Sequence, residues 1–236
     1  MNWDDYDAAL FDLDGVITPT AEVHMRAWGR MFTDFLADHP DAAPYVDDDY
    51  FAYVDGKPRY EGVQSFLESR GIDLPYGDPA DDPQDETVCA LGNRKNDYFA
   101  DVLHTDGVDA YPGSVALVDA LENRGTHLAI VSSSRNAKMV LETAGLLGRF
   151  EVIIDGEVAA HEGIAGKPKP DTYLAAAERL GVPKERAVVF EDAVSGVQAG
   201  AAGDFGLVVG VDRGAGADTL AEHGADVVVS DLAELL

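Results

Sequence analysis

Short apolar segments that end in turn residues recur along the chain. The first, AALF at residues 8–11, runs directly into the polar turn DLDG at 12–15. A short apolar run closed by turn residues is typical of a buried β-strand. The same form returns later, most weakly at 152–156, and predicts further strands within 127–134, 152–156, 187–193, 206–211 and 225–231.

Helical patterns separate these predicted strands. Apolar residues recur with the 3.6-residue period of a helix within 114–125, 136–146 and 171–182. Each of these segments carries a glycine at or near its end, which is a common helix stop: Gly125, Gly145 and Gly181. Strands that alternate with helices in this way predict an α/β protein with a doubly wound parallel sheet.

Residues 20 to 106 break this alternation. They contain aromatic, helix-like segments and two acidic, proline-containing loops, around 40–50 and 75–87, and they show no strand pattern. We therefore predict an α/β core domain formed by residues 1–19 and 107–236. An α-helical cap domain, residues 20–106, is inserted after the first strand.

The charge balance narrows the classes of partner. Of the 236 residues, 44 are Asp or Glu and 17 are Lys or Arg, which gives a formal net charge of −27. Such a surface repels phosphate backbones and anionic lipids, so we expect no nucleic-acid or membrane partner. A single cysteine, Cys89, excludes an intrachain disulfide and a multi-cysteine zinc site.

The apolar segments are also too short for a membrane protein. None approaches the roughly 18 residues that a transmembrane helix needs. The first twelve residues, MNWDDYDAALFD, are acidic and lack the basic start of a secretory signal. We expect a cytoplasmic, monomeric enzyme.

Acidic residues follow two of the predicted strands. Asp12 and Asp14 come after the first strand, and Glu191 and Asp192 come at the end of the strand within 187–193. Ligands of doubly wound sheets bind at the carboxyl ends of the strands. Crowded carboxylates repel one another unless a hard cation lies among them, and carboxylate oxygens suit Mg²⁺. These four residues are the predicted metal site.

Ser132 and Lys167 are the candidates for binding phosphate beside such a cation. Ser132 follows the strand within 127–134, and Lys167 lies in the loop GIAGKPKPD at 163–171. In so acidic a chain, a bound phosphate needs local cations and hydrogen-bond donors.

Each motif alone has a simpler explanation. An acidic pair such as Asp12 and Asp14 could lie in a solvated loop, since acidic residues are abundant here. The Glu191-Asp192 pair and the serines at 132–134 could cap helices. The order of these residue types after successive strands favours one shared site.

Together the motifs resemble those of the haloacid dehalogenase-like (HAD) phosphotransferases, which have a Rossmann-like core. DLDGV at 12–16, the strand into Ser132, the Lys167-Pro168 loop and the Glu191-Asp192 pair resemble the four motifs of that family. Within it, the chain is most similar to the β-phosphoglucomutase-like subfamily. The segments that carry this similarity are TAEVHMRAW (20–28), GKPR (56–59), NRKND (93–97), YPG (111–113) and SSSRN (132–136).

The resemblance implies roles at the core motifs. Asp12 resembles the nucleophile that becomes an aspartyl phosphate, and it is also a metal ligand. Asp14 resembles the general acid/base, whose backbone carbonyl ligates Mg²⁺. Glu191 and Asp192 resemble the remaining metal-site acids. Ser132, Ser133 and Lys167 resemble the residues that hold the transferred phosphate.

It also implies a set of substrate-binding residues. Thr20 and His24 resemble residues at the hinge between core and cap. Arg59 and Lys95 resemble cap residues that contact the substrate phosphate and sugar. The residues that resemble a dock for the distal phosphate are Ser134, Arg135 and Asn136.

The implied function is Mg²⁺-dependent phosphoryl transfer on a small sugar phosphate, with interconversion of glucose 1-phosphate and glucose 6-phosphate as the expected reaction. A sugar-phosphate phosphatase is the alternative, because both reactions form the aspartyl phosphate and differ in whether water or a sugar hydroxyl takes it. A mutase needs to bind a second phosphate, and Arg59 and residues 134–136 resemble the residues that do so. Two positions depart from the mutase pattern: Pro19 replaces an Asp, and Asp55 replaces a usual lysine.

A receiver-like signalling module is the alternative from another class. It also combines a doubly wound sheet, an acidic Mg²⁺ pocket and a phosphorylated aspartate. The long helical insert argues against it, because a switch needs no lid over its pocket.

Overall fold

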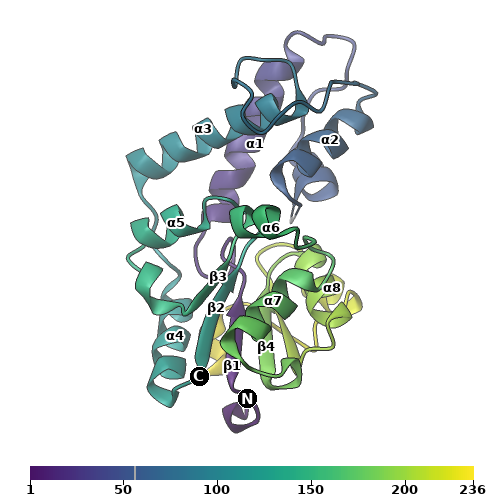
Figure 1. Ribbon diagram of the computed structural model, residues 1–236. Helices are drawn as coiled ribbons and strands as arrows, with labels where there is room; N and C mark the ends of the chain where they lie inside the picture. Colours follow the sequence, from purple (N-terminus) through teal and green to yellow (C-terminus); the bar gives the residue numbers. More distant parts are fainter. Residues whose placement is uncertain (56) are drawn as a thin grey trace. The chain divides into compact units, whose positions relative to one another are not determined.

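The computed structural model describes residues 1–55 and 57–236 (Figure 1). The chain divides into two compact units. The core unit comprises Met1–Thr20 and Val108–Leu236, and the helical unit comprises Ala21–Gly107. The division lies close to the predicted boundaries, and the roles of the two units as catalytic core and cap stay predictions.

A six-stranded, fully parallel sheet forms the centre of the core unit, in the order β3-β2-β1-β4-β5-β6. Every strand predicted from the sequence is present, and the predicted α/β fold class is confirmed. The strands are β1 (Ala8–Phe11), β2 (His127–Val131), β3 (Val152–Ile154), β4 (Ala187–Glu191), β5 (Leu207–Val211) and β6 (Val227–Val229).

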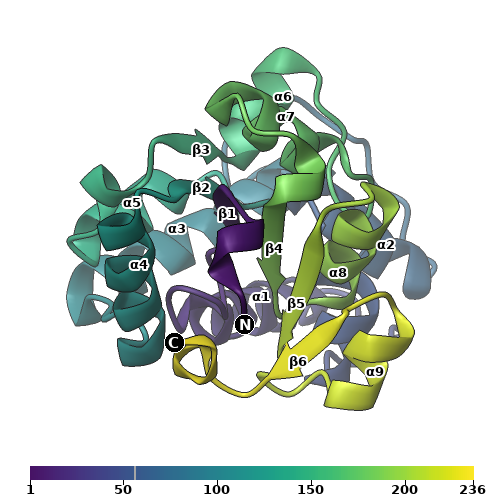
Figure 2. The same cartoon turned by 90° about the horizontal axis from the view of Figure 1, so that it is seen from below.

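Helices cover both faces of this sheet (Figure 2). One face packs against α7, α8 and α9, and the other packs against α4. The helices of the core unit are α4 (Pro112–Arg124), α5 (Ala137–Thr143), α6 (Gly156–Glu162), α7 (Asp171–Leu180), α8 (Val194–Ala202) and α9 (Ala217–Glu222). Short 3-10 helices lie at Trp3–Asp5, Leu147–Arg149, Lys184–Arg186 and Leu232–Leu235.

The central strand β1 is apolar at every position because both of its faces are buried. In β1, Ala8 and Leu10 pack into the cluster beneath α7 and α8. Phe11 points to the opposite face, where its ring stacks on Phe190 of β4 with 4.5 Å between centroids. Trp3 stacks on the same Phe190 ring.

The register of the strands brings three chain segments to one edge of the sheet. Phe11 of β1 is level with Ile130 of β2 and with Phe190 of β4. The residues that follow, Asp12 and Glu191 among them, therefore emerge side by side. The backbone N–H of Asp12 still donates to the carbonyl of Phe190, at 2.9 Å, so Asp12 is held in the line of the sheet.

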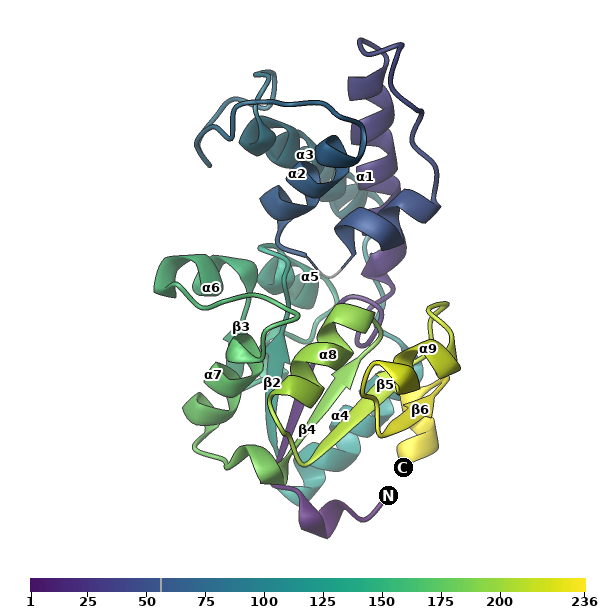
Figure 3. The same cartoon turned by 90° about the vertical axis from the view of Figure 1, so that its right-hand side faces the viewer.

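The helical unit contains α1 (Thr20–Leu36, whose first residue belongs to the core unit), α2 (Arg59–Ser69), α3 (Val88–Asp106) and a π-helical turn at Tyr50–Val54. Figure 3 shows α2 beside α3, and the two helices are in contact. Aromatic rings fill its core, as in the stack of Phe32 on Phe66 at 3.7 Å. Within 21–55 and 57–107 there is no strand, and no described helix is long and apolar enough to cross a membrane.

We expect Phe190→Ala to lower the free energy of unfolding by about 3–5 kcal/mol, because it empties a fully buried ring position between Phe11 and Trp3. Phe51→Ala is the matched control, since the Phe51 side chain is 55% exposed. Urea denaturation followed by circular dichroism measures both. Equal losses in the two variants would show that this aromatic stack does not anchor the core.

Candidate active site

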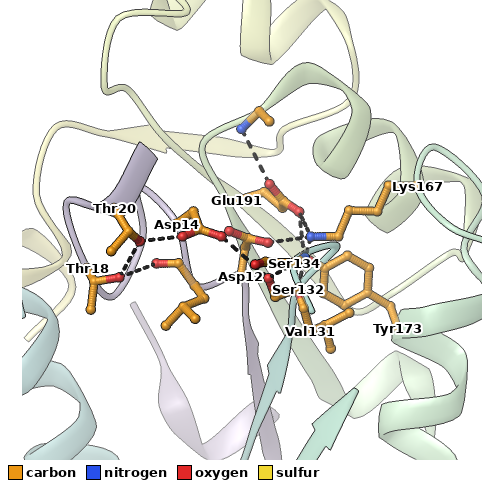
Figure 4. Close-up of polar contacts among 12 residues, drawn as sticks. Asp12, Asp14, Thr18, Thr20, Val131, Ser132, Ser134, Lys167, Tyr173 and Glu191 are labelled. Atoms are coloured by element: carbon orange, nitrogen blue, oxygen red, sulfur yellow. Dashed lines mark hydrogen bonds and ion pairs between the residues drawn. The ribbon is translucent and has the colours of Figure 1, made fainter. Parts of the chain in front are cut away.

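Four side chains from separate parts of the core unit converge at the carboxyl edge of the sheet (Figure 4). Asp12 follows β1, Ser132 follows β2, and Glu191 is the last residue of β4. Lys167 reaches them from the loop between α6 and α7. All four side chains are buried, so the explanation that Asp12 lies in a solvated loop is wrong.

The Lys167 ammonium group is the centre of this arrangement. Its Nζ lies 2.5 Å from Asp12 Oδ1 and 2.5 Å from Glu191 Oε1, and it donates to the Val131 carbonyl at 3.0 Å. Burial alone lowers the pKa of Lys167, but the negative charges of Asp12 and Glu191 outweigh that effect and raise its pKa above the ordinary value. Lys167 is therefore a charged group with an acceptor for each of its three N–H bonds.

Three carboxylates form a group that can hold a cation. Asp12, Glu191 and Asp192 each offer an oxygen, and these oxygens lie within 4.8 Å of one another. Burial raises the pKa of Asp12 well above its usual range, and the neighbouring carboxylates add to this rise against the opposing charge of Lys167. An all-oxygen donor set fits a hard divalent cation such as Mg²⁺.

The carboxylate of Asp14 belongs to a different network. Its Oδ1 accepts a hydrogen bond from the hydroxyl of Thr20, and that hydroxyl is hydrogen-bonded to Thr18 at 2.8 Å. The Ser132 hydroxyl makes a long contact of 3.5 Å with Asp14 Oδ2. Among the described residues, the three-carboxylate group does not include Asp14. This separation agrees with different chemical roles for Asp12 and Asp14.

The segment from Ser132 to Asn136 folds into consecutive turns beyond β2. The Ser132 hydroxyl accepts a hydrogen bond from the backbone N–H of Ser134 at 3.0 Å, and the Ser134 hydroxyl accepts one from Asn136 at 3.1 Å. The next helix begins only at Ala137, so the serines at 132–134 are not its N-cap. Ser133, Ser134, Arg135 and Asn136 are partly exposed.

The predicted residues of the helical unit form contacts of their own. Lys95 is buried, and its ammonium group contacts Nδ1 of His24 and lies 5.0 Å from the ring centroid of Trp28. Arg59 donates to the side chain of Asn96 at 2.7 Å. The motif GKPR begins at Gly56, which lies outside the described residues.

Sequence reasoning missed Tyr173, although the structure places it in this site. The Tyr173 side chain is fully buried, and its hydroxyl donates to Glu191 Oε1 at 2.7 Å. Burial raises the pKa of this hydroxyl well above its ordinary value, and the charge of Glu191 adds to the rise. The available signal was a tyrosine on the apolar face of a helix, since a buried tyrosine hydroxyl needs a partner.

Comparison with known proteins identifies the family. The family model described as haloacid dehalogenase-like hydrolase matches residues 6–204. The chain belongs to the haloacid dehalogenase-like hydrolases. This confirms the predicted family and makes the protein an enzyme of a phosphotransferase or phosphatase type, so the receiver-like alternative is excluded.

Relatives of this HAD-family chain support the predicted subfamily. The β-phosphoglucomutase of Mycobacterium bovis is 50% identical, over 97% of this chain and 91% of the relative. That of Bacillus subtilis is 34% identical, over 96% and 94%. The solved structure of the Clostridium difficile β-phosphoglucomutase has a TM-score of 0.80 at 24% identity, over 98% and 93% of the two chains, which supports the fold.

Gly15, in the turn after β1, lies directly against one carboxylate of the three-carboxylate group. Its φ is +87°, and a Cβ placed there would lie 1.8 Å from Asp192 Oδ2. We expect Gly15→Ala to weaken Mg²⁺ binding by tenfold or more, because the Asp192 carboxylate must move; isothermal titration calorimetry measures the affinity. Gly125→Ala is the control, because Gly125 has a φ of +76° with nothing within 4 Å of the added methyl group.

The control variant carries the same backbone strain of about 1–2 kcal/mol without the clash. It should lose stability and keep the wild-type Mg²⁺ affinity. Equal Mg²⁺ affinities in the two variants would show that the contact between Gly15 and Asp192 has no part in cation binding.

Proposed function

We propose that the protein is a β-phosphoglucomutase, which interconverts β-glucose 1-phosphate and glucose 6-phosphate through an aspartyl phosphate on Asp12. The observation that carries the proposal is the buried cluster of Asp12, Lys167 and Glu191 in a chain half identical to a β-phosphoglucomutase along nearly its whole length. The predicted cytoplasmic location, monomeric state and lack of nucleic-acid or membrane partners stay predictions.

Asp12 is the proposed nucleophile. One of its carboxylate oxygens forms a bond to phosphorus while the bond from phosphorus to the sugar oxygen breaks and that oxygen keeps the electron pair. Lys167 lies at Asp12 Oδ1, where its charge offsets the repulsion between carboxylate and phosphate. Burial of both side chains excludes water that would screen this interaction.

Mg²⁺ is the proposed cofactor, held by Asp12, Glu191, Asp192 and the backbone carbonyl of Asp14. When bound, it supplies positive charge that draws the phosphate oxygens and the carboxylates together. The carboxylate grouping within 4.8 Å supports this assignment.

Asp14 is the proposed general acid/base. Its carboxylate accepts a hydrogen bond from Thr20, and among the described residues it is not a member of the three-carboxylate group. It takes the proton of the sugar hydroxyl that attacks the aspartyl phosphate, and it returns that proton to the leaving oxygen when Asp12 is phosphorylated again. Asp12 cannot hold this proton while its oxygen bonds to phosphorus.

Two groups of residues are proposed to bind phosphate, one for the transferred phosphoryl group and one for the distal phosphate. Ser132, Ser133 and Lys167 hold the phosphoryl group that is transferred. The distal phosphate of a bisphosphate intermediate is held by donors from the turns after β2, namely Ser134, Arg135 and Asn136. A second grip of this kind is what a mutase needs and a phosphatase does not.

The helical unit contributes its own proposed substrate contacts. Arg59 supplies a guanidinium fork suited to phosphate, and Lys95 supplies a buried ammonium group beside His24. The family resemblance and the positive charges of both side chains support these contacts.

A sugar-phosphate phosphatase of the same family is the second candidate. Asp55 favours it, because an acidic residue where mutases usually carry a lysine weakens the binding of a second phosphate. The two functions differ in product: a mutase yields glucose 6-phosphate, and a phosphatase yields inorganic phosphate.

The decisive assay supplies β-glucose 1-phosphate, Mg²⁺ and a trace of glucose 1,6-bisphosphate and scores both products. We expect glucose 6-phosphate in excess over free phosphate. Asp12→Asn keeps the shape of the side chain but removes the nucleophilic charge, so turnover and phosphoenzyme formation should fall by about three orders of magnitude or more. The control is Asp38→Asn, at an exposed position. Free phosphate as the main product would replace the mutase with the phosphatase, and an active Asp12→Asn would reject the nucleophile.

Arg135→Ala tests the second phosphate grip. We expect the KM for glucose 1,6-bisphosphate to rise by about tenfold or more, because one charge-assisted hydrogen-bond partner is lost. Phosphorylation of Asp12 by acetyl phosphate, which has a single phosphate, should be unaffected. Arg124→Ala, which removes an exposed ion pair with Asp4, is the control and should change neither. Equal effects on both donors would contradict the role of Arg135.

A further inference from the structure

Tyr173 joins the apolar core to the candidate active site. It lies in the first turn of α7, and its ring packs in the cluster between the sheet and α7, where it meets Phe205 edge-on at 6.1 Å. A phenylalanine would fill the same apolar space without bringing a hydroxyl into it. The hydroxyl therefore needs an explanation other than packing, and its described partner is Glu191.

Glu191 is restrained on several sides. Its Oε1 accepts from the Tyr173 hydroxyl at 2.7 Å and pairs with Lys167 Nζ at 2.5 Å (Figure 4). Its Oε2 makes a contact of 3.4 Å with the backbone N–H of Ala193. Gly196 lies directly against the carboxylate, since a Cβ there would come within 1.8 Å of it. Among the described residues, Oε1 therefore has two close donors, whereas Oε2 has a single long contact.

The ring of Tyr173 also lies close to Lys167. The Lys167 ammonium lies 5.1 Å from the centroid of the Tyr173 ring, and the same ammonium group pairs with Asp12 and Glu191. Without the hydroxyl, Lys167 would be the only close donor to Glu191 Oε1 among the described residues, and the carboxylate could rotate to follow the ammonium group. The hydroxyl removes that freedom by adding a second fixed donor.

We propose that Tyr173 is a positioning residue whose hydroxyl holds Glu191 Oε1, so that Oε2 is presented to the divalent cation bound with Asp12 and Asp192. This inference rests on the function proposed above, because it assigns Glu191 to a cation site. Tyr173 itself contacts neither substrate nor cation in this arrangement. It acts through the orientation of Glu191.

Tyr173→Phe is the test, because it removes the hydroxyl and keeps the buried ring. Loss of a group that orients a metal ligand typically costs 10–100-fold in metal affinity, and we expect a weakening of that size in the Kd for Mg²⁺ measured by isothermal titration calorimetry without substrate. Turnover should recover towards the wild-type kcat at saturating Mg²⁺. Tyr98→Phe is the matched control, because it removes a hydroxyl that donates to Asp34 in the helical unit.

A double-mutant cycle separates positioning from a structural role. If the hydroxyl acts through Glu191, Tyr173→Phe should change the Mg²⁺ affinity far less in a Glu191→Gln background than in the wild type. Additive effects would overturn the inference. A Tyr173→Phe protein with wild-type Mg²⁺ affinity and an unchanged melting temperature would overturn it as well, while the proposed function would stand. Wild-type protein that binds no Mg²⁺ would overturn the proposed function and this inference together.

Discussion

The ion pairs of Lys167 with Asp12 and Glu191 are the interaction on which the rest of the site depends. A buried charge is tolerated only when it is paired and hydrogen-bonded, and Lys167 meets both conditions through two carboxylates and the Val131 carbonyl. The dependence is mutual, because without the ammonium group the carboxylates would repel one another in a buried space. The positive charge of Lys167 thus offsets the repulsion between an acid that follows β1 and an acid at the end of β4.

The sheet and its close backbone contacts fix where these charges lie. The level register of β1, β2 and β4 brings Asp12, Ser132 and Glu191 to one edge, and no flexible side chain has to span a long distance except Lys167. The absence of a Cβ at Gly15 leaves room for the carboxylate of Asp192, and its absence at Gly196 leaves room for that of Glu191. Rigid strands therefore set the positions of the acids, and missing Cβ atoms set how close they come to the backbone.

Much of this could be predicted from the sequence, because strand ends and chemical types are local properties. The apolar runs predict all six strands, and the order of Asp12, Ser132, Lys167 and Glu191 predicts a shared site. The pattern does not reveal α8, whose glycines have low helix propensity, although Gly200 is there to let the helix approach Val208. Nor does it reveal the carbonyl of Val131 or the hydroxyl of Tyr173, because partners chosen by three-dimensional packing leave no fixed spacing.

The charge of the site and the charge of the whole chain both show why phosphate binding needs an added cation. The site has a net charge of −2 when its three carboxylates are ionised, because Lys167 offsets only one of the charges of Asp12, Glu191 and Asp192. A phosphate dianion has to bind at this place. The chain around them is strongly acidic as well, at −27, so long-range attraction does not offset this local repulsion. Lys167 cannot supply the difference, because its single positive charge is already counted in this balance. A divalent cation is the smallest addition that neutralises the group, so the need for one follows from the count of charges as well as from the spacing of the oxygens.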